Sequence, residues 1–299
     1  MDENSPKWNQ VNHTDVLEGL AALADESADC VLFDPPYNIG YDFGNNTCRK
    51  DIDEYIAWTN QWLNEAKRVL KPTGTIFVYG FSEILAHISA NTDIDHRWLV
   101  WHYTNKTVPS LHFWQRSHES ILCMWKNKDK RLFNREKVRE PYTDNYIKGY
   151  KGKNRTRPKS GGRFGDKKAT TYTVNEKGAL PRDVIKESTL AGGAGSKSRI
   201  SYCAQCDEVI VGNAEAKRHK DHKDSIIKHP TQKPFKVSAR LLKSCMPEGG
   251  FVVIPFAGTG SECMVAQSLK YDFVGFDLNP DYVRMANSLL KRQLILDIP

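Results

Sequence analysis

The stretch from residue 249 to residue 280 constrains the fold most, because it combines two strands, a glycine turn and a helix. It reads G-G-F-V-V-I-P-F-A-G-T-G-S-E-C-M-V-A-Q-S-L-K-Y-D-F-V-G-F-D-L-N-P. Gly258 and Gly260 let the backbone turn sharply and approach a ligand closely. Asp277 ends the second strand, 19 residues after Gly258, where a carboxylate can accept hydrogen bonds from ribose hydroxyls. This unit predicts two parallel strands with a nucleoside site at their carboxyl ends.

The glycine pattern also indicates the kind of nucleotide. Cys263 stands where a dinucleotide fingerprint has its third glycine, so a cofactor without a pyrophosphate fits better. A second glycine-rich stretch, A-G-G-A-G-S-K-S at 191–198, looks like a phosphate-binding loop. A serine separates Gly195 from Lys197 and no apolar strand precedes it, so we interpret it as a flexible linker.

Strand and helix signals alternate through most of the chain, which predicts an α/β fold with a largely parallel sheet and helices on both faces. A buried strand is expected at 28–33, and further strands at 75–79, 99–103, 120–125, 250–255 and 273–277. Helical spacing of apolar residues occurs at 15–23, from 51 to a stop at 71–74, at 235–246, and from the glycine loop to 269. We expect regular structure to be lost after Lys126 and to return at His229.

The strand at 28–33 runs directly into Asp34-Pro35-Pro36-Tyr37. Pro35 has no N–H, and each proline restricts the residue before it, so the chain must leave the sheet there. The corner holds a carboxylate, carbonyls without helical partners and an aromatic ring. A plain Pro-Pro turn after a strand is the alternative interpretation.

Basic residues are concentrated in the middle of the chain. Residues 126–228 hold 26 Lys and Arg against 13 Asp and Glu, whereas the whole chain has a net charge of only +7. The stretch 148–168 is especially rich in Gly, Lys and Arg. A basic segment within an acidic body indicates binding to a polyanion, usually nucleic acid. A solvated loop region is the alternative.

Cysteine content and hydropathy indicate the cellular compartment in which the protein is expected. Seven cysteines are spread over 299 residues, which does not resemble a disulfide framework and fits a reducing cytoplasm. The first nine residues are polar and do not form a secretory signal. No run of 18 apolar residues occurs, so no membrane span is expected.

Several segments together resemble the amino-directed DNA methyltransferases, in the order of the β-class. The resemblance rests on Asp34-Pro35-Pro36-Tyr37 followed, after the basic segment, by Phe256-Ala257-Gly258-Thr259-Gly260-Ser261. Supporting segments are R-V-L-K-P-T-G at 68–74, H-P-T-Q-K-P at 229–234, V-G-F-D at 274–277 and N-P-D-Y at 279–282. Together they cover roughly residues 10–126 and 229–295.

The resemblance implies a Rossmann-like methyltransferase sheet and the transfer of a methyl group from S-adenosylmethionine to adenine N6 in duplex DNA after base flipping. Asp34 and the Pro35 carbonyl would bind the amine, and Tyr37 would stack on the base. The implied catalytic residues are Asp34, Pro35, Pro36 and Tyr37, and the implied cofactor-binding residues are Phe256, Gly258, Thr259, Gly260, Ser261 and Asp277. Lys233 and Asp15 are weaker cofactor candidates, and Asp15 could equally cap a helix.

The resemblance also divides the chain by role. Residues 1–126 would form the catalytic half, 127–228 a basic target-recognition region, and 229–299 the cofactor-binding half. Double-stranded DNA is the expected partner and no membrane is involved. A homodimer and a cognate restriction enzyme are further partners left open.

Other activities stay open at this point. Cytosine-N4 methylation is the nearest alternative, although the family more often has Ser in place of Asp34 in that case. Cytosine-C5 methylation would need a cysteine, typically after a proline, and the chain has no Pro-Cys pair. An RNA adenine methyltransferase and a catalytically idle, zinc-containing nucleic-acid binder are the remaining alternatives.

A metal-binding pattern lies near the end of the basic region. Cys203 and Cys206 are followed after twelve residues by His219 and His222. This spacing is close to that of zinc ligands, with a gap between the histidines one residue shorter than usual. It predicts one structural zinc in a knuckle at about 200–225, which is not a feature expected of the family. Two thiols and two surface histidines without metal are the alternative.

Overall fold

The structure of the protein is a computed structural model. It describes residues 6–38, 50–103, 105, 112–150, 155–157, 161–162, 165–166, 170–172, 174–190, 197–292, 294, 296 and 298. Most of the basic stretch 148–168 and residues 191–196 of the glycine-rich linker lie outside these residues. The chain forms two compact units, of which one comprises residues 1–133 and 183–299, and the other 134–182.

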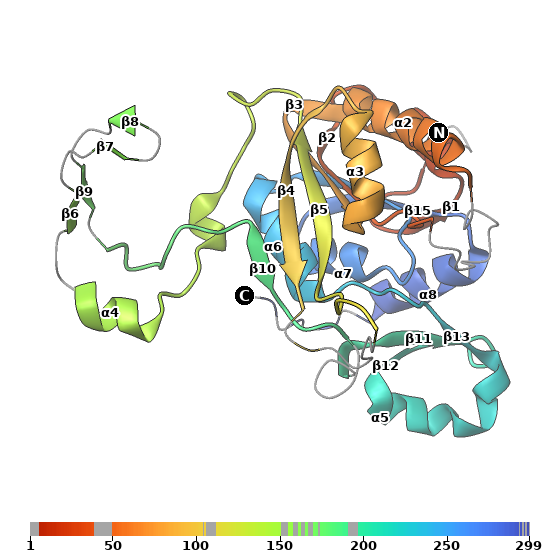
Figure 1. Cartoon of the computed structure of the whole chain (residues 1–299). Coiled ribbons are helices and arrows are strands. Elements are labelled where there is room, and N and C mark those ends of the chain that lie inside the picture. Colours follow the sequence, from red (N-terminus) through yellow and green to blue (C-terminus); the bar gives the residue numbers. More distant parts are fainter. Residues whose placement is uncertain are drawn as a thin grey trace. The chain divides into compact units, whose positions relative to one another are not determined.

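The larger unit is built on an eight-stranded sheet in the order β1-β15-β14-β2-β3-β5-β4-β10 (Figure 1). All strands run in the same direction except β5, which is antiparallel to both of its neighbours. The strands are β1 Val11–His13, β2 Ala28–Phe33, β3 Leu70–Gly80, β4 Asp95–His102, β5 His118–Trp125, β10 Val184–Lys186, β14 Phe251–Pro255 and β15 Asp272–Asp277.

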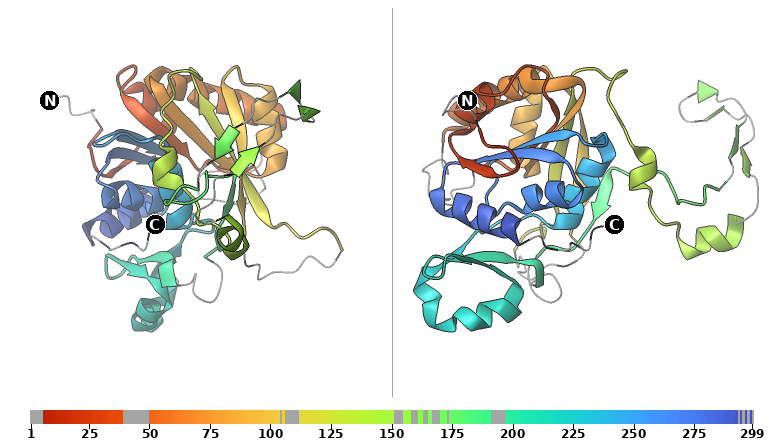
Figure 2. Two further views of the ribbon diagram at one scale, coloured as in Figure 1. Left: turned by 90° about the vertical axis from the view of Figure 1, so that its left-hand side faces the viewer. Right: turned by 180° about the vertical axis from the view of Figure 1, so that it is seen from behind.

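Helices cover both faces of this sheet (Figures 1 and 2). One core lies between the sheet and α1 Val16–Ala21, α2 Ile52–Val69 and α3 Ser82–Ala90. A second core lies between the opposite face and α6 Phe235–Cys245, α7 Ser261–Ser268 and α8 Pro280–Lys291. The predicted α/β class with helices on both faces is therefore confirmed.

Strand β2 explains why residues 28–33 are apolar without alternation. Cys30 and Leu32 belong to the core beneath α6–α8, while Val31 and Phe33 belong to the core beneath α1–α3. A parallel strand that is covered on both faces needs apolar side chains on both. The strand therefore carries Asp34 out of a rigid interior.

Two sequence-based expectations about connections need revision. The predicted turn at 71–74 lies inside β3, where the register shifts between the pairs Ala28–Leu70 and Cys30–Thr75. The expectation that regular structure is lost from Lys126 to His229 is wrong. β10 joins the main sheet, and β11 Ile200–Cys203, β12 Glu208–Val211 and β13 Ile226–Lys228 form a second sheet. These strands have three or four residues each, too few to show a clear alternation of apolar and polar residues in the sequence.

The second sheet docks on α8 within the larger unit. The Val209 amide donates to Ser288 Oγ at 3.2 Å, and Arg292 donates to the Val209 carbonyl at 3.2 Å. Arg292 also pairs with Glu215 at 2.7 Å, in the short helix α5 Gly212–Ala216. The 3₁₀ segment η3 Lys217–Ser225 follows α5 directly and leads to β13.

The smaller unit, residues 134–182, holds short elements. They are η1 Arg135–Val138, α4 Asp144–Tyr150, β6 Arg155–Arg157, β7 Gly161–Gly162, β8 Gly165–Asp166 and β9 Thr170–Tyr172. β6 pairs with β9 and β7 pairs with β8, both antiparallel. Glu140 and Ala179 form an isolated bridge near its two ends.

Six of the seven cysteines lie among the described residues. Cys30, Cys123, Cys203, Cys206, Cys245 and Cys263 are free thiols. Among the described residues, no helix is both long and apolar enough to cross a membrane.

Candidate active site

A pocket of about 930 Å³, open mouth included, lies at the carboxyl edge of the parallel strands. Asp34 follows β2, Phe256 follows β14 and Asp277 ends β15, and these three strands are neighbours in the sheet. On one side of β2 the sheet continues with β3, β5, β4 and β10, and on its other side lie β14, β15 and β1. Ligands of open α/β sheets bind where the strand order reverses in this way.

The Asp34 corner lies at one end of the pocket. Pro35, Pro36 and Tyr37 are buried and Asp34 is partly exposed. The Pro36 carbonyl accepts a hydrogen bond of 2.7 Å from the Tyr55 hydroxyl of α2. The Pro35 carbonyl accepts none from the described residues. Asp34 and Pro35 both line the pocket, so the corner brings one carboxylate and one backbone acceptor to its wall.

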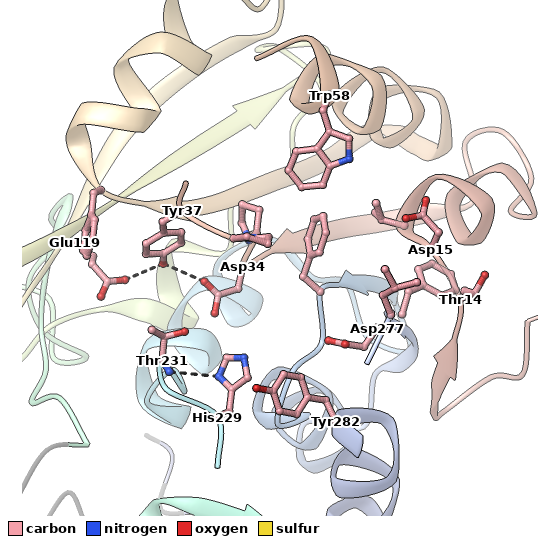
Figure 3. A pocket seen from close by; sticks show the side chains of 17 residues that line it. Thr14, Asp15, Asp34, Tyr37, Trp58, Glu119, His229, Thr231, Asp277 and Tyr282 are labelled. Atoms are coloured by element: carbon pink, nitrogen blue, oxygen red, sulfur yellow. Dashed lines mark hydrogen bonds between the residues drawn. The ribbon is translucent and has the colours of Figure 1, made fainter. Parts of the chain in front are cut away.

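Two side chains hold the Asp34 carboxylate. Lys233 Nζ lies 2.8 Å from both of its oxygens, and the Tyr37 hydroxyl lies 3.0 Å from Oδ1. The same hydroxyl lies 3.0 Å from Glu119 Oε2, so Tyr37 stands between two carboxylates (Figure 3). Glu119 also accepts a 2.7 Å hydrogen bond from the Tyr103 hydroxyl. Asp34 is thus fixed by a network that spans β2, β4, β5 and the segment before α6.

The charges of this network follow from its burial. Burial alone would lower the pKa of Lys233, but the carboxylates of Asp34 and Glu119 outweigh that effect and raise it. Burial, with Asp34 and Glu119, raises the pKa of Tyr37 well above its ordinary value. The Lys233 ammonium therefore stays charged and the Tyr37 hydroxyl stays protonated at neutral pH.

Glu262 is a further buried acid next to this network. Its oxygens accept hydrogen bonds from Ser261 Oγ at 2.7 Å and from Ser238 Oγ at 3.3 Å. Burial, together with the charge of Asp34, raises the pKa of Glu262 to about 7. The group is therefore poised to change charge near neutral pH.

The opposite end of the pocket contains Asp277, Asp15 and Thr14 (Figure 3). Asp277 accepts hydrogen bonds from the amides of Gly258 and Asn279, both at 2.8 Å. Burial raises the pKa of Asp277, and the two amides oppose this rise. Asp15 caps α1 by accepting from the Leu17 amide at 2.8 Å, so it is a helix cap that also lines the pocket.

The glycine turn behind Asp277 has an unusual backbone. Phe256, Gly258 and Gly260 have φ angles of +57°, +50° and +75°. A Cβ on Gly258 would lie 2.9 Å from His229 Nε2, so only glycine lets the histidine approach. A bulky residue such as Phe256 rarely adopts this conformation, and here it directs the ring toward the pocket beside Trp58, at 5.7 Å between ring centroids.

The predicted site residues fall into three groups. Asp34, Pro35, Pro36, Tyr37, Asp15, Phe256 and Asp277 line the pocket. Gly258, Thr259, Gly260 and Ser261 form the turn behind it, with Thr259 and Ser261 buried. Lys233, expected as a weak cofactor candidate, lies on Asp34 with its side chain 1% exposed. The structure also brings Cys203, Cys206, His219 and His222 together, away from these pocket-lining residues.

Sequence reasoning missed several residues of the pocket, among them Glu119, His229, Tyr282 and Phe81. Glu119 lies near the start of β5, and only the reversed direction of that strand carries it to the edge where the other strands end. His229 packs edge-on against Tyr282, with ring centroids 4.8 Å apart. Burial, with Lys233, lowers the pKa of His229 to about 3, so its imidazole is neutral.

Comparison with known proteins connects this geometry to one family. A family model described as DNA methylase matches residues 28–288. The type II methyltransferase M.HpaI of Haemophilus parainfluenzae is 27% identical over 282 residues, which are 93% of this chain and 72% of that protein. The DNA adenine methyltransferase YhdJ of Escherichia coli (strain K12) is 24% identical over 277 residues, covering 91% and 79% of the two chains.

A solved structure has the same fold. The PvuII DNA methyltransferase (cytosine-N4-specific) matches with a TM-score of 0.61 at 17% sequence identity. The match covers 98% of this chain and 91% of that one.

Proposed function

Because the chain belongs to the DNA methylase family of amino-directed, S-adenosylmethionine-dependent methyltransferases, we propose that it methylates the N6 amino group of adenine in duplex DNA. The observation that carries this proposal is the pair of acceptors at the Asp34 corner. The Asp34 carboxylate is fixed by Lys233 and Tyr37, and the Pro35 carbonyl receives no hydrogen bond from any described residue. An exocyclic amine has two N–H groups, which these two acceptors can bind together.

The Asp277 end of the pocket fits the nucleoside part of S-adenosylmethionine. Each Asp277 oxygen accepts one backbone amide and keeps a second lone pair, which a ribose hydroxyl can use. Phe256 and Leu278 provide apolar surface beside it. Bound there, the cofactor would supply a methyl group on a positively charged sulfur. Asp15, Phe256 and Asp277 are the residues proposed to hold it, with the turn from Gly258 to Ser261 positioning them.

At the other end, Asp34 and the Pro35 carbonyl would orient the amine. Two acceptors draw the amine toward a tetrahedral geometry and localise its lone pair on nitrogen. The lone pair would take up the methyl group of a cofactor held by Asp15, Phe256 and Asp277, and the electrons of the C–S bond would stay on its sulfur. Positive charge then develops on the nitrogen, where the carboxylate stabilises it. The nitrogen loses one proton, which Asp34 can accept and pass to water.

The aromatic side chains suit a base that has left the helix. Tyr37 packs edge-on against Phe81, with ring centroids 5.0 Å apart, and both line the pocket with Trp58. Tyr37 is only 5% exposed, and its single hydroxyl proton lies within reach of the carboxylates of Asp34 and Glu119. We therefore propose that Tyr37 positions Asp34 as well as contacting the base.

Adenine is proposed over cytosine for two reasons. Position 34 is Asp, whereas the family more often has Ser there in cytosine-N4 enzymes. YhdJ, the relative of which the match covers 79%, is named a DNA adenine methyltransferase. Cytosine-N4 is the second candidate, because the PvuII enzyme has the same fold.

We propose a restriction-modification role from the type II relative, and DNA recognition by the basic region 127–228.

The product nucleoside tests this proposal. Duplex DNA is incubated with the protein and a methyl-labelled cofactor, then digested and analysed by mass spectrometry. We expect label in N6-methyladenine, and none with Asp34→Ala. Label only in N4-methylcytosine would overturn the adenine assignment, and label only with single-stranded RNA would overturn the DNA assignment.

A further inference from the structure

The second sheet contains a cluster of four metal-ligand side chains that the proposed methyl transfer does not use. One donor atom from each of Cys203, Cys206, His219 and His222 lies within 4.8 Å of the other three. Two sulfur–nitrogen distances, Cys203 Sγ to His222 Nδ1 and Cys206 Sγ to His219 Nδ1, are both 3.6 Å. Cys206 Sγ lies 3.2 Å from His222 Nδ1. Ordinary Zn–S and Zn–N bonds in a tetrahedral site place sulfur and nitrogen about 3.6 Å apart.

The backbone explains how the short spacing between the histidines is accommodated. Cys203 ends β11, and Asp207, with φ of +56°, turns the chain after Cys206 into β12. His219 and His222 lie in η3. The backbone departs from helical geometry at both histidines, whose φ angles are −104° and −110°. This kink lets the Nδ1 atoms of both imidazoles approach the two sulfurs, at 3.2–3.6 Å.

Hydrophobic burial does not hold η3 to the sheet. The segment K-R-H-K-D-H-K-D-S has no buried residue. Ala204 donates to the Ser225 carbonyl at 2.9 Å at its far end. A metal bound by two ligands from the sheet side and two from η3 would supply the missing cross-link, since metal binding can provide folding energy.

The surroundings of the cluster also suit a metal. His219 Nε2, the nitrogen that points away from the sulfurs, lies 3.9 Å from Glu208 Oε2. A metal-bound imidazole commonly directs its other N–H toward a carboxylate. Cys203 is fully buried and Cys206 partly so, and the two thiols are not joined in a disulfide.

The chain connects this cluster directly to the active site. β13 follows η3, pairs with β11, and leads without a gap into His229, Thr231 and Lys233. The Gln232 side chain accepts from the Ile200 amide at 2.7 Å and donates to the Ser198 carbonyl at 3.0 Å. The start of β11 is thereby bonded to the same short segment that carries Lys233 to Asp34.

We propose that Cys203, Cys206, His219 and His222 bind one structural zinc ion, which fixes the segment 229–233 and so positions Lys233 on the catalytic carboxylate. Four protein ligands leave no position for water, so the metal takes no part in methyl transfer. The metal assignment stands apart from the proposed reaction, whereas its effect on turnover rests on that reaction.

Elemental analysis tests the metal directly, on protein purified without chelators or a metal-affinity tag. We expect roughly one zinc per chain in the wild type, and less than a tenth of that in Cys206→Ser. Cys123→Ser, which removes a thiol outside the cluster, should keep the metal. Because Cys206→Ser could fail to fold, His222→Cys serves as a second variant, since three cysteines and one histidine also bind zinc. Cobalt(II) added to wild-type protein depleted of zinc should give the visible absorption bands of a tetrahedral site with thiolate ligands.

The role of the metal is tested on protein from which a chelator has removed the zinc. Hydrogen exchange should become faster in 200–233, and methylation should slow by about tenfold or more, while cofactor affinity changes less. Restoring zinc should reverse both effects. Absence of zinc from the wild type together with no cobalt spectrum would overturn the site. A zinc-loaded protein whose exchange and turnover do not respond to chelation would overturn the bracing role.

Discussion

The side chains that contact Asp34 decide how it can act. Lys233 and Tyr37 bond its oxygens, so the carboxylate cannot rotate freely. Glu119 holds the other side of Tyr37. Catalysis by positioning requires this restraint, because small displacements of an acceptor cost large factors in rate.

At the Asp277 end, one carboxylate is expected to set cofactor affinity. Asp277→Ala should weaken S-adenosylmethionine binding by roughly 1–3 kcal/mol, because charge-assisted hydrogen bonds to ribose are lost. Calorimetry measures the dissociation constant. Asp272→Ala, at the opposite end of the same strand, is the matched control and should bind normally. Equal affinities for the two variants would show that the cofactor binds elsewhere.

Glu262 should make stability depend on pH. Its pKa rises from 4.5 to about 7 on folding, mainly through burial. Between these values the folded protein keeps a proton that the unfolded chain has lost, so the free energy of unfolding falls as pH rises through this window. Glu262→Gln should remove the fall and gain up to about 3 kcal/mol at pH 8. Urea unfolding at pH 4, 6 and 8 measures it, and parallel profiles for variant and wild type would refute the assignment.

At the scale of elements, the glycine turn between β14 and α7 joins the cofactor end to His229. Gly258 and Gly260 both have positive φ, and Gly258 is in contact range of the His229 ring. The imidazole is neutral, since burial and Lys233 lower its pKa to about 3. The turn and the segment 229–233 therefore form one packed wall of the pocket.

Substitution of Gly258 separates the effect of backbone strain from that of steric contact. Gly258→Ala places a Cβ 2.9 Å from His229 Nε2 at a φ of +50°. Gly249→Ala has a similar φ of +62° but nothing within 4 Å of the new Cβ. Both variants should lose about 1–2 kcal/mol of stability from the left-handed conformation, and only Gly258→Ala should also weaken cofactor binding. Calorimetric unfolding and binding measure the two effects, and identical binding in both would contradict the contact.

The sequence predicted those elements whose signal is local. The run 28–33, the long amphipathic helix after Asp51 and the glycine unit at 249–280 all have the expected structure. Glu119 was missed because the reversal of β5 depends on pairing with β3 and β4. The contact of Lys233 with Asp34 joins residues that are 199 positions apart, so no local signal in the sequence indicates it.

At the scale of the whole molecule, two halves of the chain meet at one edge of one sheet. The N-terminal half contributes the Asp34 corner on β2, and the C-terminal half contributes the turn after β14 and Asp277 on β15. Basic charge is concentrated between these halves. We therefore expect the pocket to act on one base while the middle of the chain contacts the phosphates.

The stretch 148–168 contains nine Lys and Arg and one Asp, and its removal tests this division. Deletion should weaken duplex DNA binding and reduce its salt dependence, because each lost phosphate contact lowers the slope by roughly one unit. Cofactor binding should be unchanged. Replacement of the nine basic residues by Gln keeps the length and should act like the deletion. DNA affinity that stays unchanged at low salt in both variants would exclude the stretch from binding.

The Asp34 corner is proposed to activate the target amine without binding the cofactor. The most direct measurement is the single-turnover methylation rate of Asp34→Ala on duplex DNA, paired with its calorimetric affinity for S-adenosylmethionine. Asp53→Asn, an exposed acid on α2, is the control. We predict a rate at least about a hundredfold below wild type, with cofactor affinity within about threefold. A rate near that of the wild type would contradict the claim, as would a loss of rate that merely follows a loss of cofactor binding.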